Sequence, residues 1–478
     1  MNADLFFANF GYLADAPKGV KKLRELILQL AIQGKLVQQD PNDESASKLL
    51  ERIKAEKVKL LKGKKIKMIE PLPPVSPNEA PYELPKGWEW SRIGEISLEI
   101  LGGGTPSKQN AEYWDGNIPW ASVKDLSKKK FLDNTIDHIT EAGLKGSSTN
   151  LIPPGRVIVC TRMGLGKVVI NRVATSINQD LKALTISDKI DIDYFYNFYL
   201  TQNIQGSGMT VSGIRQEALL LIPVPIPPLP EQKRIVTKVD QLMVLCDELE
   251  TRQQKKKQKL VNLNNAALDR LLTARELDDF ANAWNLIRGN FDFLYTVPET
   301  ITKLRQAILQ LAVQGKLVPQ DPNDEPAAVL LAKIKAEKER LVKEKKIKEV
   351  DPLPPVTADD APYELPKGWE WTRLVEIGQI IGGGTPSSSN PEFFADKGIP
   401  WLTPADLYGI KSKYISRGKR YLTELGLRKS SAQLMPKGTI LFSSRAPIGY
   451  VAIVQNQVST NQGFKSCVPF IPEMNEYI

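Results

Sequence analysis

An arginine directly follows a β-like run at two places, in "IVCTRMGLG" (Arg162) and in "ILFSSRAPIG" (Arg445). A guanidinium presents two parallel donors, which suit guanine or phosphate. The amide pairs Asn178-Gln179 and Asn461-Gln462 could read adenine, although such pairs more often hold loops together. These residue types favour contact with nucleic acid.

The hexapeptide Gly-Gly-Gly-Thr-Pro-Ser occurs twice, starting at Gly102 and at Gly382. Glycines let backbone N–H groups approach an anion closely, and the hydroxyls can bond phosphate. A tight turn between strands would use the same residues, so both interpretations stay open. The lysine run 128–130 and the segment 411–420 supply further positive charge that would attract phosphate.

Catalytic patterns are missing from the sequence. His138 is the only histidine and has no nucleophile motif beside it. "GLGK" at Gly164–Lys167 lacks the earlier glycine and the Ser/Thr of a phosphate-binding loop, and no zinc-hydrolase or deaminase pattern occurs. The three cysteines lie far apart, which indicates neither a disulfide framework nor a zinc site and fits a reducing cytoplasm.

The overall composition indicates a globular protein with a basic surface. The chain has 478 residues, enough for about three domains, with 42% apolar and 25% charged residues. Its formal charge of +9 is typical of proteins that bind polyanions, although basic proteins without such partners share it. No apolar run is long enough to span a membrane, and the first residues lack the features of a signal peptide.

A long internal repeat runs through the chain. "APYELPKGWEW" stands at Ala80–Trp90 and again at Ala361–Trp371, and "LRELILQLAIQGKLV" returns as "LRQAILQLAVQGKLV". A period of about 281 residues excludes solenoids and propellers. The two copies diverge between their "IPW" and "NQ" motifs, so a shared frame with different surfaces predicts recognition of a two-part target.

Helical patterns dominate outside the β-rich parts. Leu23–Val37 has one apolar stripe, and the basic segment 45–67 predicts a second helix with a solvated face. Residues 231–274 contain neither Gly nor Pro and predict one long helix that packs on the repeat helix near 304–318. Its expected seam is Ile235, Val239, Leu242, Cys246 and Leu249, resuming at Leu260, Leu263, Ala267 and Leu271.

These patterns predict a mixed α/β (α+β) fold: two globular domains from the duplication, separated by long antiparallel coiled-coil-like helices. The expected parts are a helical region with a Pro-rich linker (1–80), a first globular domain (81–228), a helical spacer (229–361) and a second globular domain (362–478). Within the spacer we expect the long helix at 231–274 and repeat helices at 300–349.

The combination "LPKGWEW…GGGTPSK…YWDGNIPW…NQ", followed by "PLPEQKRIVTKVDQLM", resembles the specificity subunit of type I restriction–modification enzymes. The resemblance occurs twice and covers nearly the whole chain. It implies two target-recognition domains that each read half of a bipartite DNA sequence. The chain departs from the family pattern at its end: when the two copies are aligned, the second lacks the residues corresponding to Tyr196–Ala274, so we expect its recognition domain to be incomplete.

The resemblance implies partners as well. These are double-stranded DNA, two adenine methyltransferase subunits and restriction/motor subunits, with S-adenosylmethionine, ATP and Mg²⁺ bound by the partners and no cofactor in this chain. The chain would then be a non-catalytic cytoplasmic subunit. A helical assembly scaffold that does not bind DNA is the alternative, and an autonomous nuclease is a third possibility.

The candidate DNA-binding residues combine these motifs with the resemblance. They are Thr105, Ser107, Lys108, Lys128, Lys129, Lys130, Arg162, Lys167, Asn178 and Gln179 in the first copy, and Thr385, Ser387, Lys411, Lys413, Arg445, Asn461 and Gln462 in the second.

Overall fold

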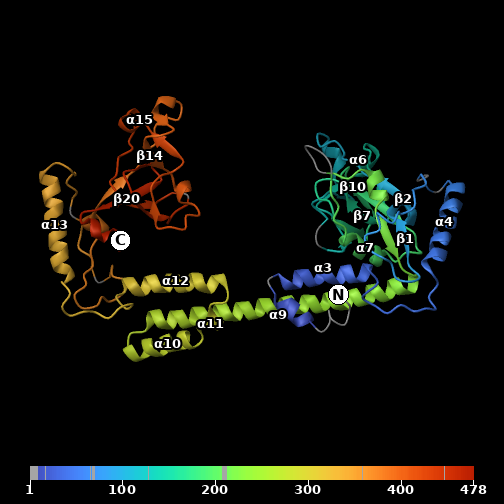
Figure 1. Cartoon of the computed structure of the whole chain (residues 1–478). Helices are drawn as coiled ribbons and strands as arrows, with labels where there is room; N and C mark the ends of the chain where they lie inside the picture. The colour runs from blue at the N-terminus through green and yellow to red at the C-terminus, as the bar shows by residue number, and fades with distance from the viewer. Residues whose placement is uncertain are drawn as a thin grey trace. The chain divides into compact units, whose positions relative to one another are not determined.

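The computed structural model describes residues 9–16, 18–64, 66, 70–126, 129–206, 213–351, 353–357, 359–445 and 447–478. The chain divides into two compact units, Met1–Lys259 and Leu260–Ile478, which are described separately. Both units combine helices with antiparallel-rich sheets (Figure 1). The expected mixed fold is confirmed in each unit.

The first unit starts with helices that pack on other elements through apolar stripes. They are α2 (Phe10–Asp15), α3 (Gly19–Ile32) and α4 (Ala46–Lys62). Leu23, Ile27 and Leu30 of α3 are buried against α9 (Leu229–Thr273), whereas Leu49 and Ile53 of α4 face the globular domain. Most basic residues of α4 are exposed, as the sequence predicts. Lys57 is the exception: it is half-buried, its Nζ donates to the carbonyl of Gly94 at 2.6 Å, and burial lowers its pKa to about 8.

The described residues of the first globular domain form three sheets. Their strand orders are β1-β11, β2-β10-β7-β8-β4 and β5-β3-β9-β6. The strands are β1 (Glu89–Arg92), β2 (Ser97–Gly102), β3 (Trp114–Ala121), β4 (Phe131–Leu132), β5 (Asp137–Ile139), β6 (Leu151–Ile152), β7 (Val157–Cys160), β8 (Val168–Asn171), β9 (Thr175–Ile177), β10 (Leu181–Ile186) and β11 (Pro223–Ile226). Short helices join them: α5 (Ile93–Ile96), η1 (Ala111–Tyr113), α6 (Glu141–Lys145), α7 (Ile192–Leu200) and α8 (Gln216–Leu220).

The start of α9 is anchored by the residues of the "PLPEQKR" motif. Gln232 is fully buried; its Oε1 accepts from the N–H of Asp191, and its Nε2 donates to the carbonyl of Pro227. Glu231 accepts a 3.0 Å hydrogen bond from Nε1 of Trp88. Burial raises the pKa of Glu231, and the hydrogen bond from Trp88 opposes that shift. The motif therefore attaches the start of α9 to the first globular domain.

Helix α9 confirms most of the expected seam. Ile235, Val239, Leu242 and Cys246 are buried, and they pack on α3 rather than on the predicted repeat helix. The α2–α3 segment runs antiparallel to α9, because Gln253 bonds the carbonyl of Ala14 in α2 whereas Asp247, earlier in α9, pairs with Arg24 in α3. The sequence missed α3 as the partner because an apolar stripe does not specify what covers it.

In the second unit, the last turns of α9 pack on α10 (Leu277–Gly289) and α12 (Pro298–Val313). This confirms the repeat helix as a partner for that part of α9. Leu263, which we expected in the seam, is instead 48% exposed, whereas Leu268 and Asn264 are buried. The stripe turns around the helix here because two neighbouring helices contact it rather than one.

The second globular domain repeats the five-stranded and the four-stranded sheet of the first, and its described residues form no counterpart of the β1-β11 sheet. Its sheets have the orders β12-β20-β17-β18-β15 and β13-β16-β14-β19. The strands are β12 (Gly378–Gly382), β13 (Phe394–Ala395), β14 (Ile399–Leu402), β15 (Tyr414–Ile415), β16 (Arg420–Leu422), β17 (Ile440–Ser443), β18 (Val451–Val454), β19 (Ser459–Thr460) and β20 (Phe464–Pro469). The unit's further helices are α11 (Phe291–Leu294), α13 (Ala327–Lys343), α14 (Leu374–Ile377), η2 (Pro391–Phe393), η3 (Pro404–Leu407), α15 (Glu424–Arg428) and η4 (Pro472–Glu476).

Candidate nucleic-acid interface

A buried tryptophan organises the same site in each domain. Trp120 lies at the end of β3 and donates from Nε1 to the carbonyl of Gly104 at 3.0 Å. Trp401 lies on β14 and donates to Gly384 at the same distance. The "IPW" motif therefore connects a central strand to the glycine-rich segment. This contact explains why both motifs recur together in the two copies.

The glycine-rich segments are tightly packed. A Cβ on Gly103 would lie 1.9 Å from the carbonyl oxygen of Ile177, and one on Gly383 would lie 2.1 Å from that of Asn461. The N–H of Gly104 already donates to Ile177. Steric fit against the neighbouring chain is thus sufficient to explain these glycines, and the hydroxyl residues after them are the exposed part.

The Asn-Gln pairs connect loops within each domain. Oδ1 of Asn178 accepts from the N–H of Asp180, and Oγ1 of Thr105 donates to Oε1 of Gln179. Asn178 is buried, whereas Gln179 is exposed. In the second copy, Asn461 accepts from Gly463, and Thr385 bonds Gln462. Gln179 and Gln462 therefore join the glycine-rich segment to the end of β9 or β19, whereas Asn178 and Asn461 stabilise the local turn.

An open cavity of about 690 Å³ lies at this junction in the first domain. Four predicted residues contribute to it: Thr105, Lys108, Asn178 and Gln179. The remaining lining residues were not predicted: Trp114, Trp120, Ser122, Lys124, Asp137, Met163 and Asp180. A comparison of the two copies at the strand that follows "IPW" could have identified Asp137, because its counterpart is Arg420.

The predicted cations of the first domain have different surroundings. Arg162 is half-exposed and lies 3.6 Å from a carboxylate oxygen of Asp180, beside the cavity. Lys167 donates to the carbonyl of Val123. Lys130 is an ion-pair partner of Asp193 at 2.9 Å and lies over aromatic rings. Lys129 is exposed, and Lys128 lies outside the described residues.

In the second domain, the predicted side chains lie on exposed loops. Oγ of Ser387 bonds Oγ of Ser389 at 2.7 Å, and Lys413 pairs with Glu476 at 2.5 Å. Lys411 and Arg445 are exposed. Arg445 follows β17, as Arg162 follows β7. The two arginines therefore hold equivalent places, and contact of any of these residues with DNA stays a prediction.

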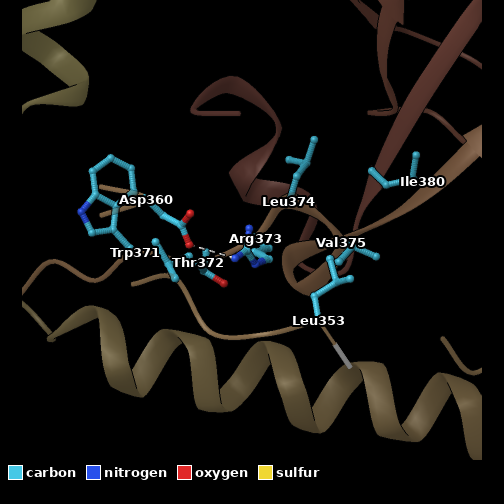
Figure 2. Close-up of a pocket in the computed structure, with 9 residues that line it drawn as sticks. Leu353, Asp360, Trp371, Thr372, Arg373, Leu374, Val375 and Ile380 are labelled. Carbon is cyan, nitrogen blue, oxygen red and sulfur yellow. Dashed lines mark hydrogen bonds and ion pairs between the residues drawn. The ribbon is translucent and has the colours of Figure 1, made fainter. Parts of the chain in front are cut away.

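A second cavity lies where the Pro-rich linker meets the second domain (Figure 2). Its volume is about 550 Å³, and its lining includes Leu353, Trp371 and Ile380. Arg373 crosses it to pair with Asp360 at 3.2 Å. In the first copy, the corresponding Arg92 is buried; it is the last residue of β1, which pairs with β11. This cavity thus belongs to the linker contact, and no residue of the glycine-rich segment lines it.

The described residues contain no group of three or more His, Cys, Asp or Glu side chains placed to hold a metal ion. His138 bonds Asn134, and all three cysteines are free and buried. No helix among the described residues is both long enough and apolar enough to cross a membrane.

Comparison with known proteins gives one consistent family. A model of the type I restriction modification DNA specificity domain matches residues 85–258 and 366–477. The EcoAI specificity subunit of a type I restriction enzyme from Escherichia coli is 39% identical over 407 residues, covering 81% of this chain and 67% of the relative. The EcoEI specificity subunit, also from E. coli, is 36% identical over 406 residues, covering 78% of this chain and 64% of the relative.

Solved structures of similar proteins come from type I systems as well. The HsdS subunit from Thermoanaerobacter tengcongensis is 16% identical, with 82% of this chain and 78% of that chain covered and a TM-score of 0.36. This chain spans about two thirds of the length of the two E. coli relatives. The family matches confirm the resemblance read from the motifs. The chain belongs to the type I restriction–modification DNA specificity family.

Proposed function

We propose that this chain is the DNA-reading, non-catalytic specificity subunit of a type I restriction–modification system. Each globular domain reads one half of a bipartite target in double-stranded DNA. Two methyltransferase subunits then methylate adenine, and restriction/motor subunits cleave the DNA. S-adenosylmethionine, ATP and Mg²⁺ belong to these partners, and the assembly works in the cytoplasm.

One observation carries the proposal: a single chain holds two family domains, each with the same tryptophan–glycine frame. Exposed hydroxyl, amide and cationic residues surround that frame in both domains. Such groups can bond phosphates and base edges. The two domains share this tryptophan–glycine frame but differ in the exposed residues around it, which suits the reading of two different half-sites. A helical scaffold without DNA binding is not favoured, because the named relatives are specificity subunits.

Helix α9 is the element that would set the distance between half-sites. It is one helix of 45 residues, which corresponds to about 65 Å at ~1.5 Å per residue. Its first part is packed on α3, and its last turns are packed on α10 and α12. A helix supported in this way supplies a fixed length. The two globular domains would then bind both half-sites at once only when the half-sites are separated by one particular distance along the DNA.

Two measurements test the proposal. A salt titration of binding to random duplex DNA should show log affinity falling steeply and linearly with log salt concentration, because lysines and arginines release counterions from phosphates. Mapping methylated adenines in cells that express the chain with its methyltransferase should reveal one bipartite motif. Salt-independent binding, or methylation without a motif, would overturn the proposal.

A further inference from the structure

One position in the candidate interface reverses its charge between the two domains. Asp137 is the first residue of β5 and pairs in register with Trp120. Arg420 is the first residue of β16 and pairs in register with Trp401. The two residues therefore occupy the same place on the same sheet plan. An acceptor-only group stands in the first domain, and a donor-only group stands in the second.

The frame that positions this residue is the same in both domains. Oδ1 of Asp125 accepts from the N–H of Ile136 at 2.8 Å, immediately before Asp137. Oδ1 of Asp406 accepts from the N–H of Lys419 at 3.0 Å, immediately before Arg420. The backbone is thus held in an equivalent way on both sides. At this position the side chain changes from a carboxylate to a guanidinium.

Asp137 faces an open, charged site. It lines the 690 Å³ cavity with Lys108 and Lys124, and its Oδ2 lies 3.9 Å from Nζ of Lys124. Its side chain is 39% exposed, and that of Lys124 is 70% exposed, so this ion pair is loose and accessible to solvent. A carboxylate placed in this way can accept a hydrogen bond from an exocyclic amine of a base, above all N4 of cytosine.

Arg420 is held over an aromatic face. Its guanidinium carbon lies 5.2 Å from the ring centroid of Trp401, and the residue is exposed. Among the described residues it has no ion-pair partner. The lysines beside Asp137 are also replaced, since Ser388 corresponds to Lys108 and Ala405 corresponds to Lys124. An orienting ring and an unpaired guanidinium suit the two acceptors of guanine.

We propose that Asp137 and Arg420 are specificity-determining residues of the two domains. Asp137 accepts from a base amine in one half-site, and Arg420 donates to O6 and N7 of guanine in the other. The inference rests on the proposed function and extends it to two named contacts. It also explains why the charge reversal lies inside an otherwise shared frame.

Selection from a random duplex library by the full chain tests this assignment. Wild-type protein should enrich a bipartite motif. Asp137→Ala should lose preference at one position of one half-site, and Arg420→Ala should lose a guanine preference in the other, each by about 5- to 150-fold. Asp137→Arg should shift the affected position toward guanine. The opposite half-site should stay unchanged in every variant.

The controls are Arg417→Ala and Asp133→Ala, which change charge near the same strands and should leave the motif as it is. Arg420→Lys keeps the charge but lacks the bidentate fork, so it should also relax the guanine preference. This variant tests the assignment even if Arg420→Ala does not fold. An unaltered motif, or a uniform loss of affinity across sequences, would refute the assignment while leaving the proposed function intact. Absence of any motif with wild-type protein would overturn both.

Discussion

Replacing Arg92 by methionine should destabilise the first domain by about 3 kcal/mol. The guanidinium of Arg92 is buried and donates to the carbonyls of Pro73, Pro74 and Leu221 as well as to Glu79. Methionine fills much of the same space but leaves three carbonyls without this donor. A lost partner costs about 1–3 kcal/mol per group, and we take the low end because the linker residues are exposed.

The second copy supplies a matched control. Arg373 bonds the corresponding carbonyls of Pro354 and Pro355 and pairs with Asp360, but its side chain is 33% exposed. Arg373→Met should therefore cost only about 1 kcal/mol or less. The difference comes from β11 and the residues before it, which cover Arg92 in the first domain.

Hydrogen exchange measured by mass spectrometry separates the two effects. In the Arg92→Met variant, the amides of β1 and β11 should lose about 100-fold of their protection, because 1.4 kcal/mol corresponds to a factor of ten. Peptides from the second domain should be unaffected. Equal losses for the two substitutions, or unchanged protection in β1 and β11, would show that burial of Arg92 does not support this domain.

Three further outcomes are expected. Hydrogen bonds from Arg92 and Ser76 lower the pKa of Glu79 from 4.5 to about 2, so the ionised carboxylate stabilises the fold above pH 4.5 and loses that effect as the pH falls toward 2. The stability of Glu79→Gln in an acid titration should therefore depend less on pH over that range than the stability of the wild type, and identical curves would contradict this role. Asn264 is buried in α9, and neither of its side-chain polar atoms has a hydrogen-bond partner among the described residues. Asn264→Leu should therefore raise the free energy of unfolding, measured by thermal denaturation, by about 1–2 kcal/mol, whereas the control Asn262→Leu, at an exposed position, should not. Inserting seven residues after Lys256 adds about 10 Å of helix and should change the gap in the methylation motif without changing either half-site; an unchanged gap would refute the fixed-length role of α9.

The sequence by itself determined the duplication, the family and the long helix. These properties follow from local patterns: repeated motifs, apolar spacing, and the absence of Gly and Pro over 231–274. The mixed composition of each globular domain was also predictable, because short β-rich runs alternate with turn residues. Local patterns do not depend on contacts between distant segments, so they can be recognised in the sequence without the tertiary structure.

Only the tertiary structure decided which residues meet. Arg92 and Arg373 are the same residue type in the same motif, yet a strand more than 130 positions away buries only the first. The pairing of Trp120 with Asp137, and of Trp401 with Arg420, depends on strand register in the same way. Register and burial are set by contacts between distant segments, and for that reason the residue types alone could not specify them.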